Sequence, residues 1–385
     1  MPDLDPRHET GFLDWLACAA GGAREPAARA ARAAGDGRLE RVVAAGTAGH
    51  VLDFDDTYEP GLVHLSAPVA PAALVTAAET GASVGEALGA YAEGFEAMAA
   101  VARASHPALY DRGWHPTAVL GPVGSATAAA RLLGADPERA VALALLRAGG
   151  LRAAFGSDGK ALQVGMAAAA GVEAARLVAA GADVLATIPT AAAGFEAAAG
   201  ATWAHPDPGD PAVQRNWIKA YPCCLQTHGA LEAAAALPAA VRAGAEALAV
   251  VVHPISRQAA PLDDVATRLQ AKFSIPYIVA WAMRHGPPGV GAFASLDPEV
   301  RAEAAARVRV ETDPALGTAE AVIRSGGEEL TRVTAPLGSP ARPLDAAALA
   351  AKVRGLAGDR LDGALDDPGV AAAEVLAAAL PDSGP

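Results

Sequence analysis

The sequence predicts a mainly α protein, in which a large all-helical domain is followed by a smaller domain that mixes helices and strands. Three observations support this prediction. The chain has 385 residues, more than one domain usually holds. Its hydrophobic content of 52% comes mainly from alanine, with only 7 Phe, 5 Trp and 5 Tyr, a composition typical of closely packed helices. After residue 236 the pattern changes, and β-like runs appear.

Glycines divide the first part of the chain into helices. Gly21-Gly22 and Gly81 mark two of the breaks, because glycine readily adopts the left-handed conformation that ends a helix. Between the breaks, Ala, Leu and Val recur at helical spacing. The expected helices cover residues 12–20, 24–34, 37–51, 68–79 and 85–104. Because the breaks are short, we expect antiparallel helical neighbours.

The helical pattern continues through the middle of the chain. Gly134 ends a predicted helix over 121–133, and Pro137 occupies the first position of the next helix. Thr117 is a candidate helix cap, and an Ala-rich helix follows Lys160. These elements complete a helical domain over residues 1–236.

The second predicted domain covers residues 237–344. Strands are expected at 247–255 and 306–312, and a hairpin at 319–334 turns at Gly326-Gly327. One helix, 275–285, lies between these strands. Residues 345–385 return to Ala-rich helix and are expected to pack on the first domain.

The most informative stretch is H-V-L-D-F-D-D-T-Y-E-P-G-L-V-H-L-S-A-P, residues 50–68. Its carboxylates stand between apolar residues, where burial costs free energy unless each acid has a partner or a task. Three interpretations remain open. The stretch could be a solvated helix end before a Pro-Gly turn, a Mg²⁺-diphosphate site of the isoprenoid-synthase type over 55–59, or an acid/base cluster.

Three further positions are candidates for chemistry. His115 follows Trp114 in a turn, which suggests a pocket that the tryptophan partly shields from water, although a lone histidine is more often structural. Lys160 is the only lysine before Lys219 and stands at a helix start, where it could hold an anion or transfer a proton; the alternative is a surface lysine. Residues 217–228 again contain one Lys and one His near aromatic residues.

Composition argues against several classes of protein. The net charge of −13 disfavours nucleic acid or an anionic membrane as a partner. The 3 cysteines fit neither a disulfide framework nor a zinc or iron–sulfur site, so a reduced, cytoplasmic protein is expected. The N-terminus is unlike a signal peptide, and Pro and Gly break the longest uncharged runs, so no transmembrane span is expected.

Taken together, the motifs resemble the MmgE/PrpD family, which includes 2-methylcitrate dehydratase, cis-aconitate decarboxylase and iminodisuccinate epimerase. The motifs are H-V-L-D-F-D-D-T (50–57), H-L-S-A-P (64–68), G-W-H-P-T (113–117), G-K-A-L-Q-V-G (159–165), K-A-Y-P-C-C-L-Q-T-H (219–228) and A-K-F-S-I-P-Y (271–277). The resemblance implies a large helical domain with a smaller α+β lid domain, a homodimer, and a cofactor-free and metal-free site that acts on small di- or tricarboxylates.

Carried over residue by residue, the resemblance implies a catalytic set and a substrate-binding set. The catalytic set is Asp53, His64, His115, Lys160 and Tyr277, and the substrate-binding set is Thr57, Lys219 and His228. This chain departs from the family pattern in two places. Gln163 stands where some members have a histidine, and Leu65 follows His64 where proline is frequent. The chain is also shorter than the dehydratases, so the substrate is less defined than the fold.

The residue chemistry agrees with a reaction next to a carboxylate. Removing a proton there builds negative charge on an enediolate, which Lys160, Lys219 and the histidines can stabilise. A buried base then moves the proton, and an acid such as Tyr277 delivers it. Dehydration of a 2-hydroxy polycarboxylate is the first expectation, with epimerisation, decarboxylation or a non-catalytic carboxylate-binding protein as alternatives. A second acidic motif is missing and aromatics are few, which disfavours the isoprenoid-synthase interpretation.

Overall fold

The structure is a computed structural model that describes residues 4–381. The chain divides into two compact units. The first comprises Met1–Ala154, Asp158–Ile218 and Asp345–Pro385, and the second comprises Phe155–Ser157 and Lys219–Leu344. The main segment of the second unit includes α11 (His228–Ala235), which packs against α15 and against β5 and β6 of that unit.

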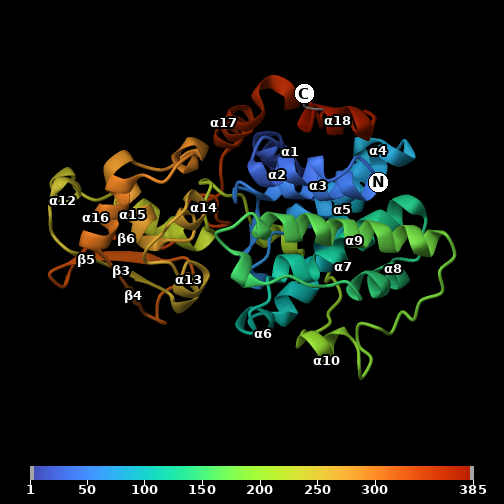
Figure 1. The fold of residues 1–385 in the computed structure, drawn as a ribbon, viewed down its shortest axis with the longest axis horizontal. Coiled ribbons are helices and arrows are strands. Elements are labelled where there is room, and N and C mark those ends of the chain that lie inside the picture. Colours follow the sequence, from blue (N-terminus) through green and yellow to red (C-terminus); the bar gives the residue numbers. More distant parts are fainter. Residues whose placement is uncertain (1–3, 382–385) are drawn as a thin grey trace. The chain divides into compact units, whose positions relative to one another are not determined.

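The first unit is a bundle of helices, and Figure 1 shows α7 and α9 running side by side in it. Its helices are α1 (Pro6–Gly22), α2 (Pro26–Ala33), α3 (Arg38–His50), α4 (Ser66–Thr80), α5 (Val84–Ser105), α6 (Ala108–Asp111), α7 (Pro116–Leu133), α8 (Pro137–Leu145), α9 (Gly159–Ala179), α10 (Phe195–Ala199), α17 (Ala346–Ala357) and α18 (Ala372–Ala379). The mainly α prediction is confirmed.

Local sequence explains where several helices begin and end. Asp5 accepts a hydrogen bond from the Arg7 N–H, so α1 begins at Pro6, six residues before its predicted start. Ser83 and Glu86 form a capping box at the start of α5. Gly81 and Gly134 adopt left-handed conformations that end α4 and α7.

The expectation of an all-helical first domain is wrong in one detail. Strand β1 (Thr57–Tyr58) pairs with β2 (Asn216–Trp217) in a two-stranded antiparallel sheet. Each strand has two residues, which is too short for an alternating pattern to show in the sequence. The pair fixes the chain directly after residues 53–56, which we call the acidic stretch.

Small residues let the helices of the first unit approach closely. A Cβ added at Gly165 would lie 2.4 Å from the Val43 carbonyl oxygen, and one at Gly46 would lie 2.9 Å from the Gly165 Cα. Both distances are shorter than any normal contact, so α3 and α9 touch backbone to backbone. This close approach brings the end of α3 and the start of α9 together.

The second unit is an α+β layer with strands β3 (Leu248–Val252), β4 (Val308–Thr312), β5 (Ala321–Ser325) and β6 (Glu328–Val333) in the order β4-β3-β5-β6. Strand β3 is parallel to β4 and antiparallel to β5, and β5 and β6 form the predicted hairpin at Gly326-Gly327. Its helices are α11, α12 (Ala239–Ala243), α13 (Pro254–Ala259), α14 (Arg268–Ala271), α15 (Ile275–His285) and α16 (Pro298–Arg307).

Helix α9 is long and apolar enough to cross a membrane by length and composition. However, 61% of its most apolar window is buried inside the helical unit, which is the pattern of a core helix of a soluble domain. Its apolar composition therefore reflects its central position in the bundle.

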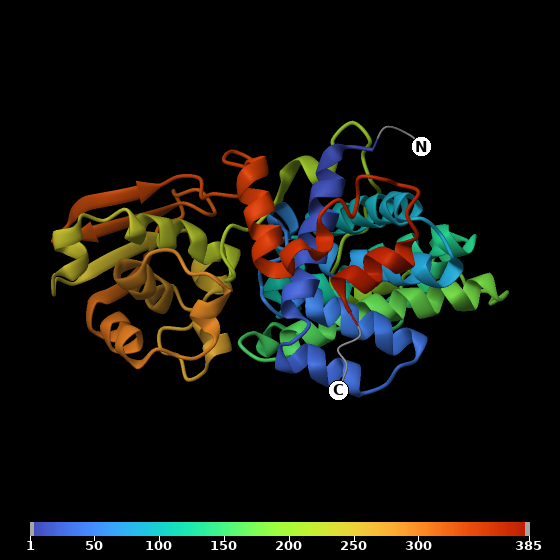
Figure 2. The ribbon, with the colours of Figure 1, turned by 90° about the horizontal axis from the view of Figure 1, so that it is seen from above.

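The C-terminal helix α17 returns to the first unit and packs against α1, as Figure 2 shows. Lys352 on α17 forms a buried ion pair with Asp14 on α1, with Nζ 2.6 Å from Oδ1. The same ammonium donates to the Phe54 carbonyl oxygen at 2.8 Å and lies over the Phe54 ring. One lysine thus holds both α1 and the acidic stretch.

We expect Lys352→Met to lower the free energy of unfolding by about 3–5 kcal/mol, because it removes one partner of a buried ion pair and leaves the Asp14 charge behind. Urea unfolding followed by circular dichroism measures the loss. The double variant Asp14→Asn/Lys352→Met should recover part of it, because no charge remains. A loss below about 1 kcal/mol, the size of an exposed ion pair, would contradict this role.

Candidate active site

The acidic stretch follows α3 in a tight, buried turn. Asp53 adopts a left-handed conformation with φ 53°, which is rare for a residue with a side chain. Such strain costs about 1–3 kcal/mol and persists only where the surroundings enforce it. Here the Asp53 N–H donates to the His50 carbonyl oxygen, and Lys352 holds the next carbonyl, that of Phe54. The helix-end interpretation with solvated acids is wrong, since Asp53, Asp55 and Asp56 are all buried.

Lys160 connects the acidic stretch to helix α9. Its Nζ lies 2.8 Å from Asp53 Oδ1 and 2.8 Å from His50 Nε2. An ammonium group can only donate, so His50 Nε2 must accept and carries no proton. The ring proton of His50 is therefore on Nδ1, which donates to Asp55 Oδ2 at 2.9 Å. Burial, opposed in part by Asp55, lowers the pKa of His50 and keeps it neutral.

Asp55 stands beside two histidines. The Nδ1 atom of His64 lies 3.1 Å from the same Asp55 oxygen that His50 contacts, and the two rings are 4.6 Å apart. Burial alone would raise the pKa of the Asp55 carboxyl, but His50 and His64 outweigh burial and hold that pKa well below its ordinary value of 3.8. Asp55 is therefore an ionised carboxylate that orients both rings.

His64 has the arrangement of a general base. The Asp55 carboxylate favours the ring proton on Nδ1, which leaves the lone pair of a neutral His64 on Nε2. This Nε2 atom lies 3.8 Å from Asp53 Oδ1, so a proton taken up there would be stabilised by a second carboxylate. The Thr117 hydroxyl oxygen accepts from the His64 backbone N–H at 3.1 Å and fixes the backbone of the histidine.

His115 immediately precedes helix α7 and is 2% exposed. Its ring lies 6.1 Å from that of His50, in a stacked arrangement. Burial, together with the nearby Lys160, lowers the pKa of His115 well below its ordinary value. His115 is therefore a neutral imidazole, and its Nδ1 lies 2.7 Å from Gln163 Nε2 on α9.

The structure thus brings four of the predicted site residues into one cluster: Asp53, His64, His115 and Lys160. Thr57 lies on β1 in the same unit, and its buried hydroxyl has no hydrogen-bond partner within residues 4–381. Sequence reasoning did not include three residues of the cluster, His50, Asp55 and Gln163. The motif H-V-L-D-F-D-D-T contained the first two, but their contacts are tertiary.

The remaining predicted site residues, Lys219, His228 and Tyr277, belong to the second unit. Lys219 and His228 are buried, and His228 Nε2 lies 3.4 Å from the Cys223 carbonyl oxygen. Tyr277 on α15 accepts a hydrogen bond from the Asp297 N–H at 3.0 Å. Burial raises the pKa of the Tyr277 hydroxyl, which keeps its proton at neutral pH.

Comparison with family models identifies both parts of the chain. Residues 6–203 match the MmgE/PrpD N-terminal domain, and residues 221–375 match the MmgE/PrpD C-terminal domain. The chain belongs to the MmgE/PrpD family. This confirms the family that the sequence motifs indicated.

Two curated relatives of this MmgE/PrpD chain are cis-aconitate decarboxylases. The one from Mus musculus is 30% identical over an alignment of 299 residues, which covers 70% of this chain and 60% of the relative. The one from Homo sapiens is 31% identical over an alignment of 210 residues, which covers 50% of this chain and 43% of the relative. The aligned regions therefore span about half the length of these enzymes, which act on a small tricarboxylate.

The side-chain cluster around Lys160 also contains atoms that could bind a metal. One atom each from His50, Asp55 and His64 lie within 4.8 Å of one another. A metal-bound histidine usually donates its second N–H to a carboxylate or carbonyl. Here the second nitrogen of His50 faces the Lys160 ammonium, which cannot accept a proton. The donor set therefore fits a hydrogen-bonded acid/base cluster better than a metal site.

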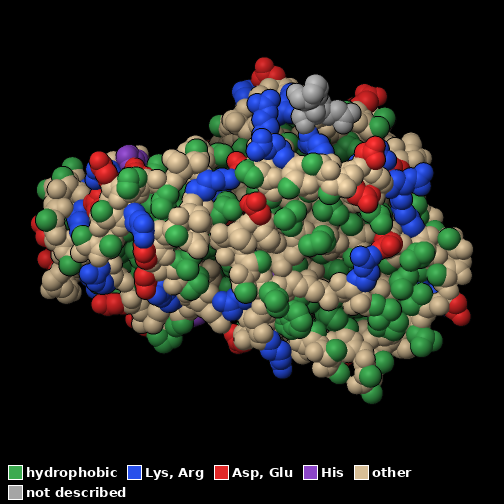
Figure 3. Space-filling view, in the orientation of Figure 1, with side chains coloured by type: hydrophobic (Ala, Val, Ile, Leu, Met, Phe, Trp, Pro, Cys, Tyr) green, Lys and Arg blue, Asp and Glu red, His purple; other side chains and the backbone are tan. Residues whose placement is uncertain are grey.

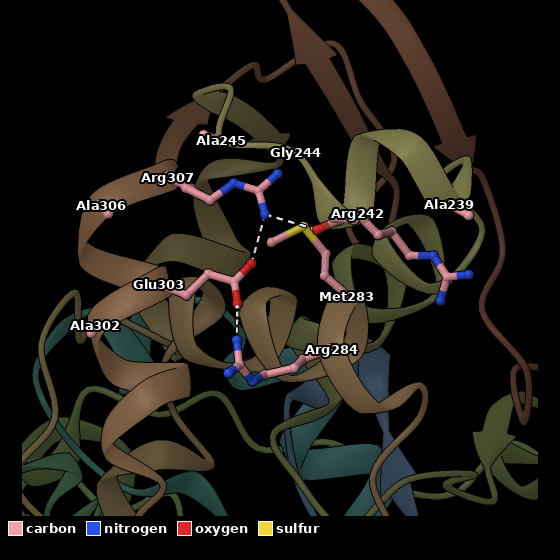
Figure 4. Close-up of a pocket in the computed structure, with 11 residues that line it drawn as sticks. Ala239, Arg242, Gly244, Ala245, Met283, Arg284, Ala302, Glu303, Ala306 and Arg307 are labelled. Atoms are coloured by element: carbon pink, nitrogen blue, oxygen red, sulfur yellow. Dashed lines mark hydrogen bonds and ion pairs between the residues drawn. The ribbon is translucent and has the colours of Figure 1, made fainter.

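A hollow in the second unit, between α12, α15 and α16, is lined by three arginines and one acid (Figure 4). Glu303 pairs with Arg284 and Arg307, and Arg307 also donates to the Arg242 carbonyl oxygen at 3.0 Å. In Figure 4 the Arg242 side chain points away from Glu303. Glu299 also pairs with Arg284, so the two arginines beside Glu303 have two acidic partners between them. These acids balance the charges of the two arginines, which makes the hollow a poor candidate for a carboxylate site.

Asp56 leads a separate hydrogen-bond network. It accepts from the Ser66 hydroxyl at 2.7 Å and from the Asn216 amide at 2.7 Å, and the Ser66 hydroxyl lies 2.6 Å from the Tyr91 hydroxyl. Burial raises the pKa of Asp56 from 3.8 to about 7, although these donors oppose the shift. Asp56 therefore titrates near neutral pH and supports the fold next to Asp55.

This network predicts a pH dependence of stability. Between pH 3.8 and about 7 the folded protein binds a proton at Asp56 that the unfolded chain does not bind. The stabilisation is therefore complete below the unfolded pKa and is lost as the pH rises through 7. Asp56→Asn removes this titration, so the stability of wild type relative to the variant should fall between pH 4 and 8. Urea unfolding across this range measures it, and a flat difference would contradict the assignment.

Proposed function

We propose that the protein is a cofactor-independent lyase that removes a proton next to a carboxylate of a small di- or tricarboxylate. One observation carries the proposal: a histidine oriented by a buried carboxylate, His64 with Asp55, stands in the same cluster as the Lys160 ammonium. A base beside a cation is what proton removal next to a carboxylate requires.

In the proposed dehydration, His64 Nε2 takes the proton from the carbon next to the substrate carboxylate. The electron pair of that C–H bond forms the carbon–carbon double bond, and the carbon–oxygen bond of the neighbouring hydroxyl breaks. Lys160 stabilises the charge on the intermediate, and a neutral His115 donates a hydrogen bond to it. Tyr277 supplies the proton with which the hydroxyl leaves as water.

Three residues of the second unit, Tyr277, Lys219 and His228, take part in the proposed reaction. We assign Tyr277 as the proton donor, and Lys219 and His228, with Thr57 of the first unit, as groups that bind the substrate. The Tyr277 hydroxyl keeps its proton at neutral pH, so it has a proton to donate. Tyr277→Phe should lower kcat, whereas Lys219→Met should mainly raise KM.

Decarboxylation is the second candidate, because both curated relatives are decarboxylases. In that reaction the bond to CO₂ breaks first and the carbanion is then protonated, so Lys160 and a proton donor are needed but no base. Epimerisation would use the same first proton transfer as dehydration. A binding protein without catalysis would turn over none of these substrates.

Proton NMR in D₂O distinguishes these reactions. The EDTA-treated protein is incubated with 2-methylcitrate, citrate, cis-aconitate, tartrate and aspartate-derived dicarboxylates. Loss of water from a hydroxy acid supports the proposal, and loss of CO₂ supports the second candidate. Deuterium that enters a C–H bond without elimination indicates epimerisation. Activity that appears only after Mg²⁺ is added would overturn the metal-independent mechanism.

We propose that the protein is a cytoplasmic homodimer. Within residues 4–381, the large hydrophobic side chains that are most exposed are Leu146, Leu151, Met166, Leu177 and Leu185. All lie within residues 146–185 of the first unit, and Figure 3 shows hydrophobic side chains gathered over that region. Such a patch is typical of a subunit interface.

Light scattering should give a molar mass twice the 38.4 kDa of one chain, and the double variant Met166→Glu/Leu177→Glu should have the mass of a monomer. A monomeric wild type would refute the dimer.

A further inference from the structure

We propose that Gln163 is a positioning residue that fixes the ring proton of His115 on Nε2, so that His115 acts as a hydrogen-bond donor and not as a base. The assignment of the proton rests on geometry within the first unit alone. Its consequence for catalysis rests on the proposed function.

The orientation of the Gln163 side-chain amide is set by the backbone of Leu151. Gln163 Oε1 accepts from the Leu151 N–H at 2.9 Å, and Gln163 Nε2 lies 3.3 Å from the Leu151 carbonyl oxygen. Turning the amide over would place its NH₂ against an N–H and its oxygen against a carbonyl. Both hydrogen bonds would become repulsive, so the backbone selects one orientation.

This orientation determines the state of His115. The Gln163 NH₂ group lies 2.7 Å from His115 Nδ1, and an amide NH₂ can only donate. His115 Nδ1 must therefore accept and carries no proton. Burial, together with the neighbouring Lys160, His50 and His64, lowers the pKa of His115, although Asp53 opposes the shift, so the ring does not gain a second proton. The single proton of the neutral ring is then on Nε2.

Backbone hydrogen bonds connect the segment that contains His115 to the segment around Leu151 that orients Gln163. The His115 N–H donates to the Gly150 carbonyl oxygen at 3.0 Å, and the Arg152 N–H donates to the Gly113 carbonyl oxygen at 3.0 Å. Gly150 has φ 133°, and a Cβ there would lie 3.1 Å from Gln163 Oε1. Glycine at this position therefore leaves room for the amide. The backbone around Leu151 therefore holds Gln163 and His115 in fixed positions relative to each other.

The consequence is a division of work between two histidines. Asp55 favours the His64 proton on Nδ1, which leaves Nε2 as a base. Gln163 donates to Nδ1 of His115, which leaves Nε2–H as a donor. A neutral donor aimed at developing negative charge stabilises it without having to lose its proton. The two rings thus serve opposite functions because their partners differ.

The test is two-bond ¹H–¹⁵N NMR of the imidazole nitrogens in the full-length protein labelled with ¹⁵N-histidine. A His115→Gln spectrum assigns the signals. Wild type should show an unprotonated Nδ1 and a protonated Nε2 for His115. A protonated Nδ1 in wild type would overturn the proposal at once, whether or not any substrate is known.

Gln163→Glu keeps the shape of the side chain but can only accept, so it should place a proton on His115 Nδ1. With a substrate that wild type turns over, the variant should also lose activity as the pH rises above the new His115 pKa, where Nε2 gives up its proton. Gln163→Met should show a mixture of both ring forms. Gln214→Glu, an exposed position in the same unit, controls for the added charge. An unchanged Nδ1 in Gln163→Glu would refute the positioning role, whereas inactivity of wild type with a correct Nδ1 would refute only the proposed function.

Discussion

Lys160→Ala is expected to abolish turnover. The substitution removes the ammonium that contacts both Asp53 and His50 in the cluster, so the charge on the intermediate loses its nearest cation. Losing a single aligned donor typically lowers kcat by ~10²–10³-fold, and here the arrangement of His50 is lost as well. The rate is measured by NMR with whichever substrate of the panel wild type converts.

The same substitution is also expected to destabilise the fold, because Asp53 loses this ion pair inside the protein. Removing one partner of a buried pair costs about 3–5 kcal/mol. The double variant Lys160→Ala/Asp53→Asn should recover stability but not activity, which separates the two effects. Near-normal activity of either variant would remove Lys160 from the active site.

The sequence predicted most helices because their limits are marked by local chemistry. Gly81 and Gly134 end helices in the structure where they were expected to, since glycine accepts the left-handed conformation at low cost. The β1–β2 pair could not be predicted, because Thr57 and Trp217 are partners across 160 residues of chain. Contacts of this kind depend on the assembled fold and leave no local pattern.

The same limit applies to the cluster. Motifs identified Asp53, His64, His115 and Lys160, but not how they interact. No motif contained Asp14 or Lys352, whereas in the structure the two residues form a buried ion pair. Asp55 appeared as a possible magnesium ligand, whereas in the structure it orients two histidines. The residue types indicated acid/base chemistry, and only tertiary contacts assign the individual roles.

Asp55→Asn provides the second large expected effect, and Asp56→Asn is its matched control. Asp56 is the adjacent buried carboxylate, but it belongs to the Ser66 network and does not contact the histidines in the residues described. Both substitutions replace a buried carboxyl group by an amide of the same shape. Asp56→Asn should therefore change stability and leave the pH dependence of the rate close to that of wild type.

Asp55→Asn is expected to lower kcat by ~10²–10⁴-fold, the range associated with losing a general base. The substitution removes the negative charge beside His64 Nδ1, which lies 3.1 Å from the same oxygen that accepts from His50. A neutral amide no longer stabilises the positive charge that His64 gains when it takes up the substrate proton. His64 therefore becomes a weaker base. A pH–rate profile like that of wild type, together with a normal rate, would show that His64 does not depend on Asp55.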